Sequence, residues 1–240
     1  VMDLAKAGQV ALALIPINTL MTFFGLAKNQ GFAVAEDPSV FMDRAEAAQV
    51  LDLLTDLAAH VDPRCLTLDP IGVLDWMGRT ADAPAYCPFG YGYTNYSRDG
   101  YCRFPIVFAD APGVGDNGPG GTVIGGTGIA ISSQCADPEV AADYAFWIAS
   151  ADCQADLFFE SGGQPANAVA WDADTTNAAA RDFFRNTRTT LDTSWLRPRY
   201  DGYMGFQAEG GDILHACLRG ETPPRDTLDA LDAAYRVSRQ

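Results

Sequence analysis

Apolar residues recur at helical spacing in several stretches of the chain. The clearest helix is predicted over residues 43–60, where apolar side chains line one face and Pro63 stands just beyond the end. That face is formed by Ala47, Val50, Leu51, Leu54, Leu57, Ala58 and Val61. Further helices are predicted at 71–77, 177–189, 205–218 and 226–237.

Two other patterns complete the set of elements. Residues 10–15 predict a short strand, 16–19 a turn, and 20 to about 30 a helix that stops at Gly31. Strands are also predicted over 101–108 and over the glycine-broken run 122–131. Asp137 and Pro138 then supply the N-cap and first-turn proline of a long helix reaching about residue 159.

Strands that alternate with helices indicate the α/β class, and no internal repeat is visible. The 240 residues suffice for one large domain or two small ones, and 48% hydrophobic against 20% charged residues can bury a real core. No run of 18 or more apolar residues encodes a transmembrane helix. The net charge of −15 disfavours nucleic acid as a partner, because it repels phosphate backbones.

The six cysteines permit disulfides without requiring them, and buried free thiols are an equal alternative. Cys87 and Cys102 flank one aromatic segment and form the pair that best fits a bridge, which would imply an oxidising compartment. No C-x-x-C pair occurs, and His60 and His215 stand at spacings unsuited to a zinc site. We therefore expect no metal.

Catalytic motifs are equally scarce. The run from Gly125 to Gly128 lacks the following Lys-Ser/Thr and an adjacent helix start, so it fails as a phosphate loop. There is no G-x-S-x-G elbow, and no pair of acids stands out as a glycosidase dyad. We expect no cofactor and no enzyme activity.

The strongest chemical signal is an aromatic run between residues 84 and 96. Tyr91, Tyr93 and Tyr96 follow no apolar period and have glycines, Asn95 and Arg98 as neighbours. Rings beside hydrogen-bonding groups suit a flat ligand with apolar faces and a polar rim, which describes a pyranose. Ordinary packing of a loop is the alternative. Residues 195–203 have the same character.

Three pieces of the sequence follow one another: a glycine-rich strand, a helix that opens with an Asp-Pro pair, and a closing G-x-P. They are Gly125-Gly126-Thr127-Gly128, Asp137-Pro138-Glu139-Val140-Ala141 and Gly163-Gln164-Pro165. In this order they resemble the extracellular solute-binding proteins of bacterial ABC importers, in the sugar-type group (family 1). Thr127 departs from the pattern, since relatives often carry a bulky aromatic there.

The resemblance implies an α/β, periplasmic-binding-protein-like fold of two lobes. Residues 1–122 would begin the C-terminal lobe, 123–170 would form the hinge strand and an N-terminal-lobe segment, and 171–240 would return to the C-terminal lobe. The chain opens as if within a helix and shows no signal peptide, so we expect that the front of a longer protein is missing. The protein would be periplasmic or extracellular, and that missing part would be the place for a membrane anchor.

The resemblance also implies a function and a site. The protein would capture a sugar by hinge closure and deliver it to a membrane permease. The cleft would contain Asn18, Thr19, Tyr91, Tyr93, Asn95, Gly126, Thr127, Trp195, Tyr203 and Phe206, with Tyr91 as the stacking ring. Two alternatives stay open: a binder of amino acids, opines or peptides that uses Arg98, Arg197 or Arg199, and a carbohydrate-active hydrolase.

Overall fold

The computed structural model describes residues 1–240, which form two compact units. Unit 1 consists of Val1–Tyr91, Asp110–Ile124 and Thr189–Gln240, and unit 2 of Gly92–Ala109 and Gly125–Arg188. The division at 124 lies beside the boundary expected at 122. Residues 92–109 and 171–188, however, group with unit 2. Each unit is described by itself below.

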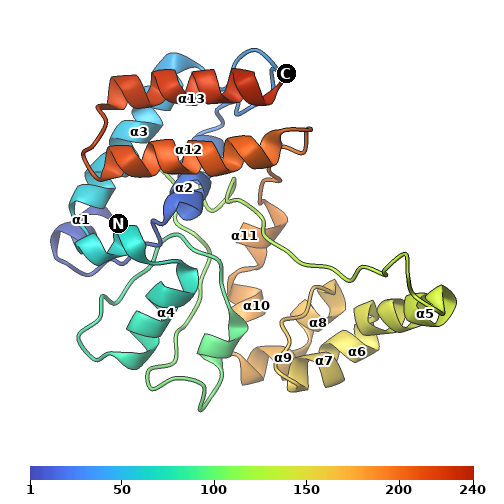
Figure 1. Ribbon diagram of the computed structural model, residues 1–240. Helices are drawn as coiled ribbons and strands as arrows, with labels where there is room; N and C mark the ends of the chain where they lie inside the picture. Colours follow the sequence, from blue (N-terminus) through green and yellow to red (C-terminus); the bar gives the residue numbers. More distant parts are fainter. The chain divides into compact units, whose positions relative to one another are not determined.

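Unit 1 is a layered helical body in which α2 lies against α12 and α3, and α12 lies against α13 (Figure 1). Its elements are α1 (Met2–Lys6), α2 (Pro16–Asn29), α3 (Arg44–Ala59), η1 (Pro63–Thr67), α4 (Pro70–Arg79), α11 (Arg188–Asp192, which starts at the unit boundary), α12 (Tyr203–Leu218) and α13 (Pro224–Ser238). The helices predicted at 43–60, 71–77, 205–218 and 226–237 are confirmed to within a few residues.

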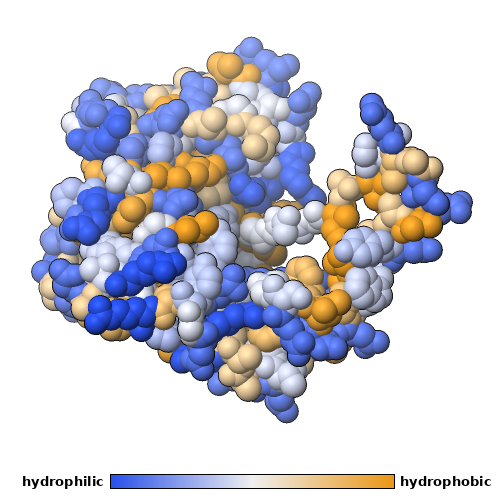
Figure 2. All heavy atoms as spheres, turned by 60° about the horizontal axis from the view of Figure 1, so that its bottom comes forward, coloured by the Kyte–Doolittle hydropathy of each residue, from blue (hydrophilic) through white to orange (hydrophobic).

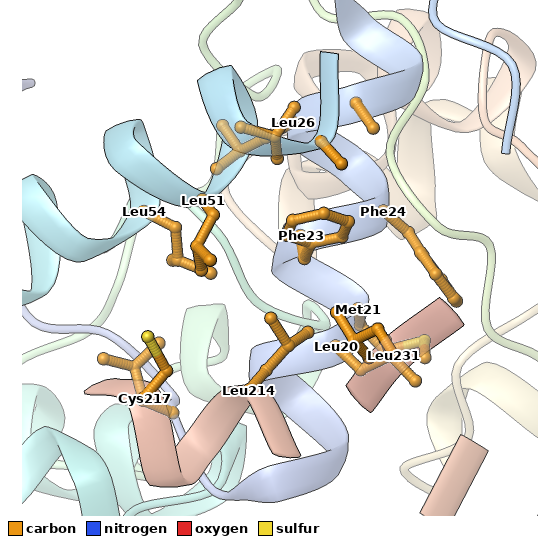
Figure 3. Close-up of a cluster of buried hydrophobic side chains, with 14 of the residues drawn as sticks. Leu20, Met21, Phe23, Phe24, Leu26, Leu51, Leu54, Leu214, Cys217 and Leu231 are labelled. Atoms are coloured by element: carbon orange, nitrogen blue, oxygen red, sulfur yellow. The ribbon is translucent and has the colours of Figure 1, made fainter. Parts of the chain in front are cut away.

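The core of unit 1 is where these helices meet. Leucines and phenylalanines of α2 and α3 point toward Leu214 and Cys217 of α12 and Leu231 of α13 (Figure 3). Phe23 and Phe24 are fully buried, and the ring of Phe41 packs 6.3 and 6.2 Å from theirs. This clustering of apolar side chains supplies the main driving force for folding of the unit.

Close backbone approach also positions α12. A Cβ placed on Gly211 would lie 2.8 Å from the carbonyl oxygen of Pro16, so only glycine lets α12 touch the first turn of α2. The prediction of a turn over residues 16–19, ahead of the helix, is wrong. Pro16 begins the helix, and the Thr19 amide donates to the Ile15 carbonyl at 2.9 Å, because a proline is tolerated at a first helical position.

Unit 2 is built from short helices. They are η2 (Thr94–Ser97), α5 (Pro138–Ala149), α6 (Ala151–Ala155), α7 (Leu157–Glu160), α8 (Ala168–Asp172), α9 (Asp174–Ala179) and α10 (Phe183–Asn186). The long helix predicted to residue 159 is broken at Ser150, whose hydroxyl donates to the Trp147 carbonyl and accepts from the Cys153 amide. The predicted helix 177–189 is broken at Arg181 and Asp182, which adopt left-handed backbone angles.

The core of unit 2 is mainly aromatic. Phe184 packs edge-on against Trp171 at 5.1 Å and against Phe159 at 5.9 Å between ring centroids. Phe183 contacts Phe108 at 4.8 Å. The helices of this unit are too short to be stable alone, so these ring contacts hold them together.

The predicted strands do not form ladders. Three isolated bridges occur, Val10↔Tyr86 and Val123↔Trp195 in parallel and Asp37↔Val40 in antiparallel sense. Residues 10–15 are extended, yet their amides bond to separate partners, Ala11 to the Tyr86 carbonyl and Leu14 to the Cys65 carbonyl. A strand requires consecutive bonds to one neighbour, which these segments lack.

The remaining sequence predictions concern thiols, histidines and membranes. All six cysteines are free, so the bridge between Cys87 and Cys102 was predicted incorrectly. Each thiol donates within its own loop, Cys87 to the Phe89 carbonyl and Cys102 to the Phe104 carbonyl, both at 3.3 Å. His215 donates from Nε2 to the Leu66 carbonyl at 2.8 Å. No helix combines the length and apolarity needed to span a bilayer.

Candidate functional site

The predicted ligand-binding residues divide between the two units. Unit 1 contains Asn18, Thr19, Tyr91, Trp195, Tyr203 and Phe206, and unit 2 contains Tyr93, Asn95, Gly126 and Thr127. The two sets are therefore described separately.

The start of α12 carries the most unusual group in unit 1. Gly202 precedes the helix at φ 96°, and a Cβ there would overlap the Ser238 carbonyl oxygen. This turn places Tyr203, whose side chain is 5% exposed and whose Oη atom has no hydrogen-bond partner. Buried hydroxyls are almost always satisfied, so an orphaned one calls for a partner that is not part of the chain.

Two polar side chains accompany this phenol. Arg197 donates from Nη1 to Oε1 of Gln207 at 2.7 Å. Gln207 stands four residues after Tyr203 on α12, so both lie on the same face of the helix, and both are buried. Burial raises the pKa of Tyr203 to about 12, against the opposing effect of the Arg197 charge. The phenol of Tyr91 contributes to the same rise in pKa as the smallest of its causes.

Three other predicted residues of unit 1 have structural contacts. Phe206 is 1% exposed and packs against Phe41 at 5.2 Å, so it belongs to the core and does not reach a ligand. Thr19 is fully buried and donates its hydroxyl to the Leu14 carbonyl at 2.8 Å. Trp195 is half-buried and packs edge-on against Phe24 at 5.6 Å.

Asn18 lies beside Thr19 in the first turn of α2 and is 8% exposed. Because α12 touches this turn at Pro16, Asn18 is held on the same rigid pair of helices as Tyr203. Helices fixed by backbone contact keep the spacing of their side chains constant.

In unit 2 the aromatic loop is held at its backbone. Gln164 accepts from the Thr94 amide at 2.9 Å and donates to the Gly92 carbonyl at 3.2 Å. Tyr93 is 37% exposed, and Asn95 is half-buried. The loop is thus ordered by one glutamine while the Tyr93 ring is presented at the surface, as expected for a contact residue rather than for a core aromatic.

Gly126 and Thr127 lie in an extended, exposed segment of unit 2. A Cβ on Gly126 would meet no atom within 4 Å. A shallow pocket of about 380 Å³ opens further along the segment, between residues 129–135 and α5. It is lined by apolar side chains together with the polar Ser132 and Gln134, and it contains none of the predicted residues.

The three arginines considered for a charged ligand differ in their surroundings. Arg98 donates to the Phe159 and Gly163 carbonyls at 2.8 and 3.2 Å and stacks 3.9 Å from the Phe159 ring. Burial lowers the pKa of this guanidinium, and its role is to fix unit 2. Arg199 is exposed. Arg197 alone joins the buried polar cluster of unit 1.

Gln207 was missed by the sequence analysis. Its position four residues after Tyr203 was a usable signal, because a glutamine on the face of a helix that also carries Tyr203 and Phe206 must be buried or functional. Its actual partner, Arg197, lies ten residues earlier, in a loop whose path no local pattern reveals.

No model of a known protein family matches the chain, and no curated protein matches it. Solved structures do. Maltose-bound MalE3 of T. maritima aligns with a TM-score of 0.79 and 17% identity, over 98% of this chain and 63% of that one. A ribitol complex of an ABC transporter solute-binding protein from Agrobacterium radiobacter gives 0.77 and 18%, over 98% and 63%. A tagatose complex from Thermotoga lettingae gives 0.75 and 18%, over 96% and 59%.

The chain therefore spans about 60% of the length of these solved proteins. Such low identity establishes the fold rather than the ligand. The predicted fold class is confirmed, and the chain has a periplasmic-binding-protein-like fold.

Proposed function

We propose that this chain is part of a solute-binding protein that captures a sugar and delivers it to the permease of an ABC importer. The observation that carries the proposal is the buried, unpartnered hydroxyl of Tyr203 on α12, the helix that also carries the buried Gln207. A sugar offers hydroxyl oxygens for this phenol and a flat apolar face for an aromatic ring such as that of Tyr91. Similar folds hold maltose, tagatose and ribitol.

In the proposed mechanism, Tyr91 stacks on the sugar and Tyr203 donates to one of its oxygens. Asn18, Tyr93, Asn95 and Thr127 supply further polar contacts, and the glycine at 126 gives the hinge strand its freedom. Closure of two lobes around a ligand is a general device of domain hinges. The closed form then docks on the permease, outside the cytoplasmic membrane, without cofactor or turnover.

We further propose that more polypeptide of the same protein completes the fold. The support is an apolar surface on unit 2, visible as orange side chains around α5 (Figure 2). This apolar surface consists of Ile129, Ile131, Val140, Tyr144, Phe146 and Trp147, which are 41–77% exposed. Contiguous exposed apolar residues of this kind mark an interface, and the similar solved proteins have the additional length to cover it.

The test is titration calorimetry on the intact protein with maltose, tagatose and ribitol. Tyr91→Ala is expected to lower the affinity for the bound sugar about tenfold, since an aromatic contact contributes roughly 0.5–1.5 kcal/mol beyond area burial. Tyr101→Ala, an exposed tyrosine outside the site, is the control and leaves affinity unchanged. Equal affinity in wild type and Tyr91→Ala would exclude Tyr91 from the site.

A hydrolase remains the enzymatic alternative, and a labelled oligosaccharide separates it from a binder. The proposed binder returns the label in the intact oligosaccharide after prolonged incubation. Release of shorter labelled sugars by the purified protein, abolished on heating, would contradict the proposal.

A further inference from the structure

The polar cluster of unit 1 contains more hydrogen-bond donors than acceptors. Tyr203 Oη is buried and unpartnered, and Gln207 Oε1 accepts a hydrogen bond from Arg197. What remains are the phenol O–H, the side-chain amide N–H groups of Gln207 and the other N–H groups of the Arg197 guanidinium. No carboxylate of the protein bonds to any of these three side chains.

Arg197 has fewer acceptors than the other half-buried arginines that lack a carboxylate partner. Half of the arginines, 7 of 14, form an ion pair with a carboxylate. Arg98 and Arg239 do not, but each donates to a backbone carbonyl and to a second acceptor. Arg197, which is also half-buried, donates only to the neutral amide of Gln207. A half-buried guanidinium with unused donors favours an acceptor group that carries negative charge.

The excess of donors over acceptors narrows the ligand group. A sugar hydroxyl accepts through one oxygen and can donate to the Tyr203 oxygen, so it satisfies only part of these donors. A carboxylate only accepts, through two oxygens, and matches a guanidinium in a two-point geometry. With Tyr203 and Gln207 one helical turn apart, a carboxylate beside Arg197 would have one oxygen within reach of each neighbour.

From this geometry we propose that Arg197, Tyr203 and Gln207 bind the carboxylate of an acidic sugar, such as a hexuronate, whose ring stacks on Tyr91. The inference rests on the proposed function and specifies its ligand class. Arg197 and Tyr203 are thus specificity-determining residues.

The experiment is titration calorimetry on the intact protein at pH 7 with matched pairs of sugars. Glucuronate is compared with glucose, and galacturonate with galactose, because the members of each pair differ only at the carboxylate. We expect at least one uronate to bind 10-fold or more tighter than its neutral partner. Raising the ionic strength weakens the uronate and leaves the neutral sugar unchanged.

Variants of Arg197 and Tyr203 test which side chains cause the preference for uronates. Arg197→Gln is expected to remove most of the uronate preference, Arg197→Lys to restore part of it, and Tyr203→Phe to weaken uronate binding about fivefold. Arg199→Gln removes an exposed arginine two residues away and is the matched control, with uronate affinity unchanged within twofold. Thermal melting of each variant verifies that it is folded.

The two proposals fail in different ways. If neutral sugars bind as tightly as uronates, or if Arg197→Gln weakens both classes equally, the inference is wrong and the sugar-binding function stands. If neither neutral nor acidic sugars bind to the folded wild-type protein, both are wrong. Binding of a uronate that is as strong in Arg197→Gln as in wild type would also overturn the inference.

Discussion

Helices α12 and α5 are both rich in apolar residues, yet their surroundings differ completely. α12 buries Phe206 and Leu214 in the core of unit 1, whereas α5 has no buried residue at all. On α5 the side chains of Phe146 and Val140 are 77% and 62% exposed. The comparison shows that an apolar sequence predicts burial only when a partner element is present to bury it. α5 has the composition of a buried helix, but no neighbouring element covers its apolar side chains.

The largest effect that tests this comparison comes from two phenylalanines. Phe24→Ala, at a fully buried position of unit 1, is expected to cost about 3–5 kcal/mol of unfolding free energy, because it leaves a cavity. Phe146→Ala on α5 is expected to cost less than about 0.5 kcal/mol in this chain. Urea denaturation of both variants measures the difference. Comparable losses would mean that α5 is packed in solution.

An arginine pair sharpens the comparison within unit 2. Arg98→Met removes two charge-assisted bonds to backbone carbonyls and is expected to cost about 1.5–3 kcal/mol. Arg103→Met, whose guanidinium contacts only the Phe104 ring at 5.0 Å, is the control and changes stability by less than about 0.5 kcal/mol. Denaturation followed by tryptophan fluorescence compares them. Equal stability of the two variants would remove Arg98 from its structural role.

A smaller effect is expected at the start of α12. Gly202→Ala places a methyl group against the Ser238 carbonyl at a positive φ, so we expect a loss of about 1–3 kcal/mol. Gly205→Ala, in the same helix with open space around it, is expected to gain about 0.5–1 kcal/mol from helix propensity. Thermal denaturation measures whether each substitution lowers or raises the stability. A stabilising Gly202→Ala would show that the tight turn before Tyr203 is not maintained.

The smallest effect is a pH dependence at Cys87. Burial of this thiol raises its pKa to about 12, above the ordinary value of the unfolded chain. The neutral thiol therefore stabilises the fold below about pH 9, and this contribution is lost as the pH rises from about 9 toward 12. Cys87→Ala is expected to flatten the decline in stability over that range, measured by denaturation at stepped pH. If the stability of Cys87→Ala declines with pH as in the wild type, groups other than Cys87 cause the decline.

The helices of unit 1 were predictable, and the interruptions of unit 2 were not. The helix 43–60 carries its own N-cap in Asp43, which accepts from the Ala45 amide at 2.9 Å, so local sequence suffices. The break at Ser150 depends on a hydroxyl that bonds to the Trp147 carbonyl, a choice that apolar spacing does not reveal. The left-handed angles at Arg181 and Asp182 likewise reflect tertiary packing.

The residues predicted for the candidate site differ in how the fold places them. Tyr91, Tyr93 and Tyr203 stood out as aromatics outside any apolar period, and the structure leaves Tyr93 at the surface. Phe206 looked similar in sequence but fills the core beside Phe41. The link between Arg197 and Gln207 joins a loop to a helix, and only the folded chain brings those two side chains together.

The contact between Gly211 and Pro16 has a consequence for how the residues on α2 and α12 can change. Because two backbones touch there, the helices on either side cannot slide, and residues such as Asn18 and Tyr203 lie on a fixed frame. Exchanges at these positions would alter one side chain at a time without disturbing the architecture. A single added methyl group at 211 would move the whole frame, and with it every contact at once.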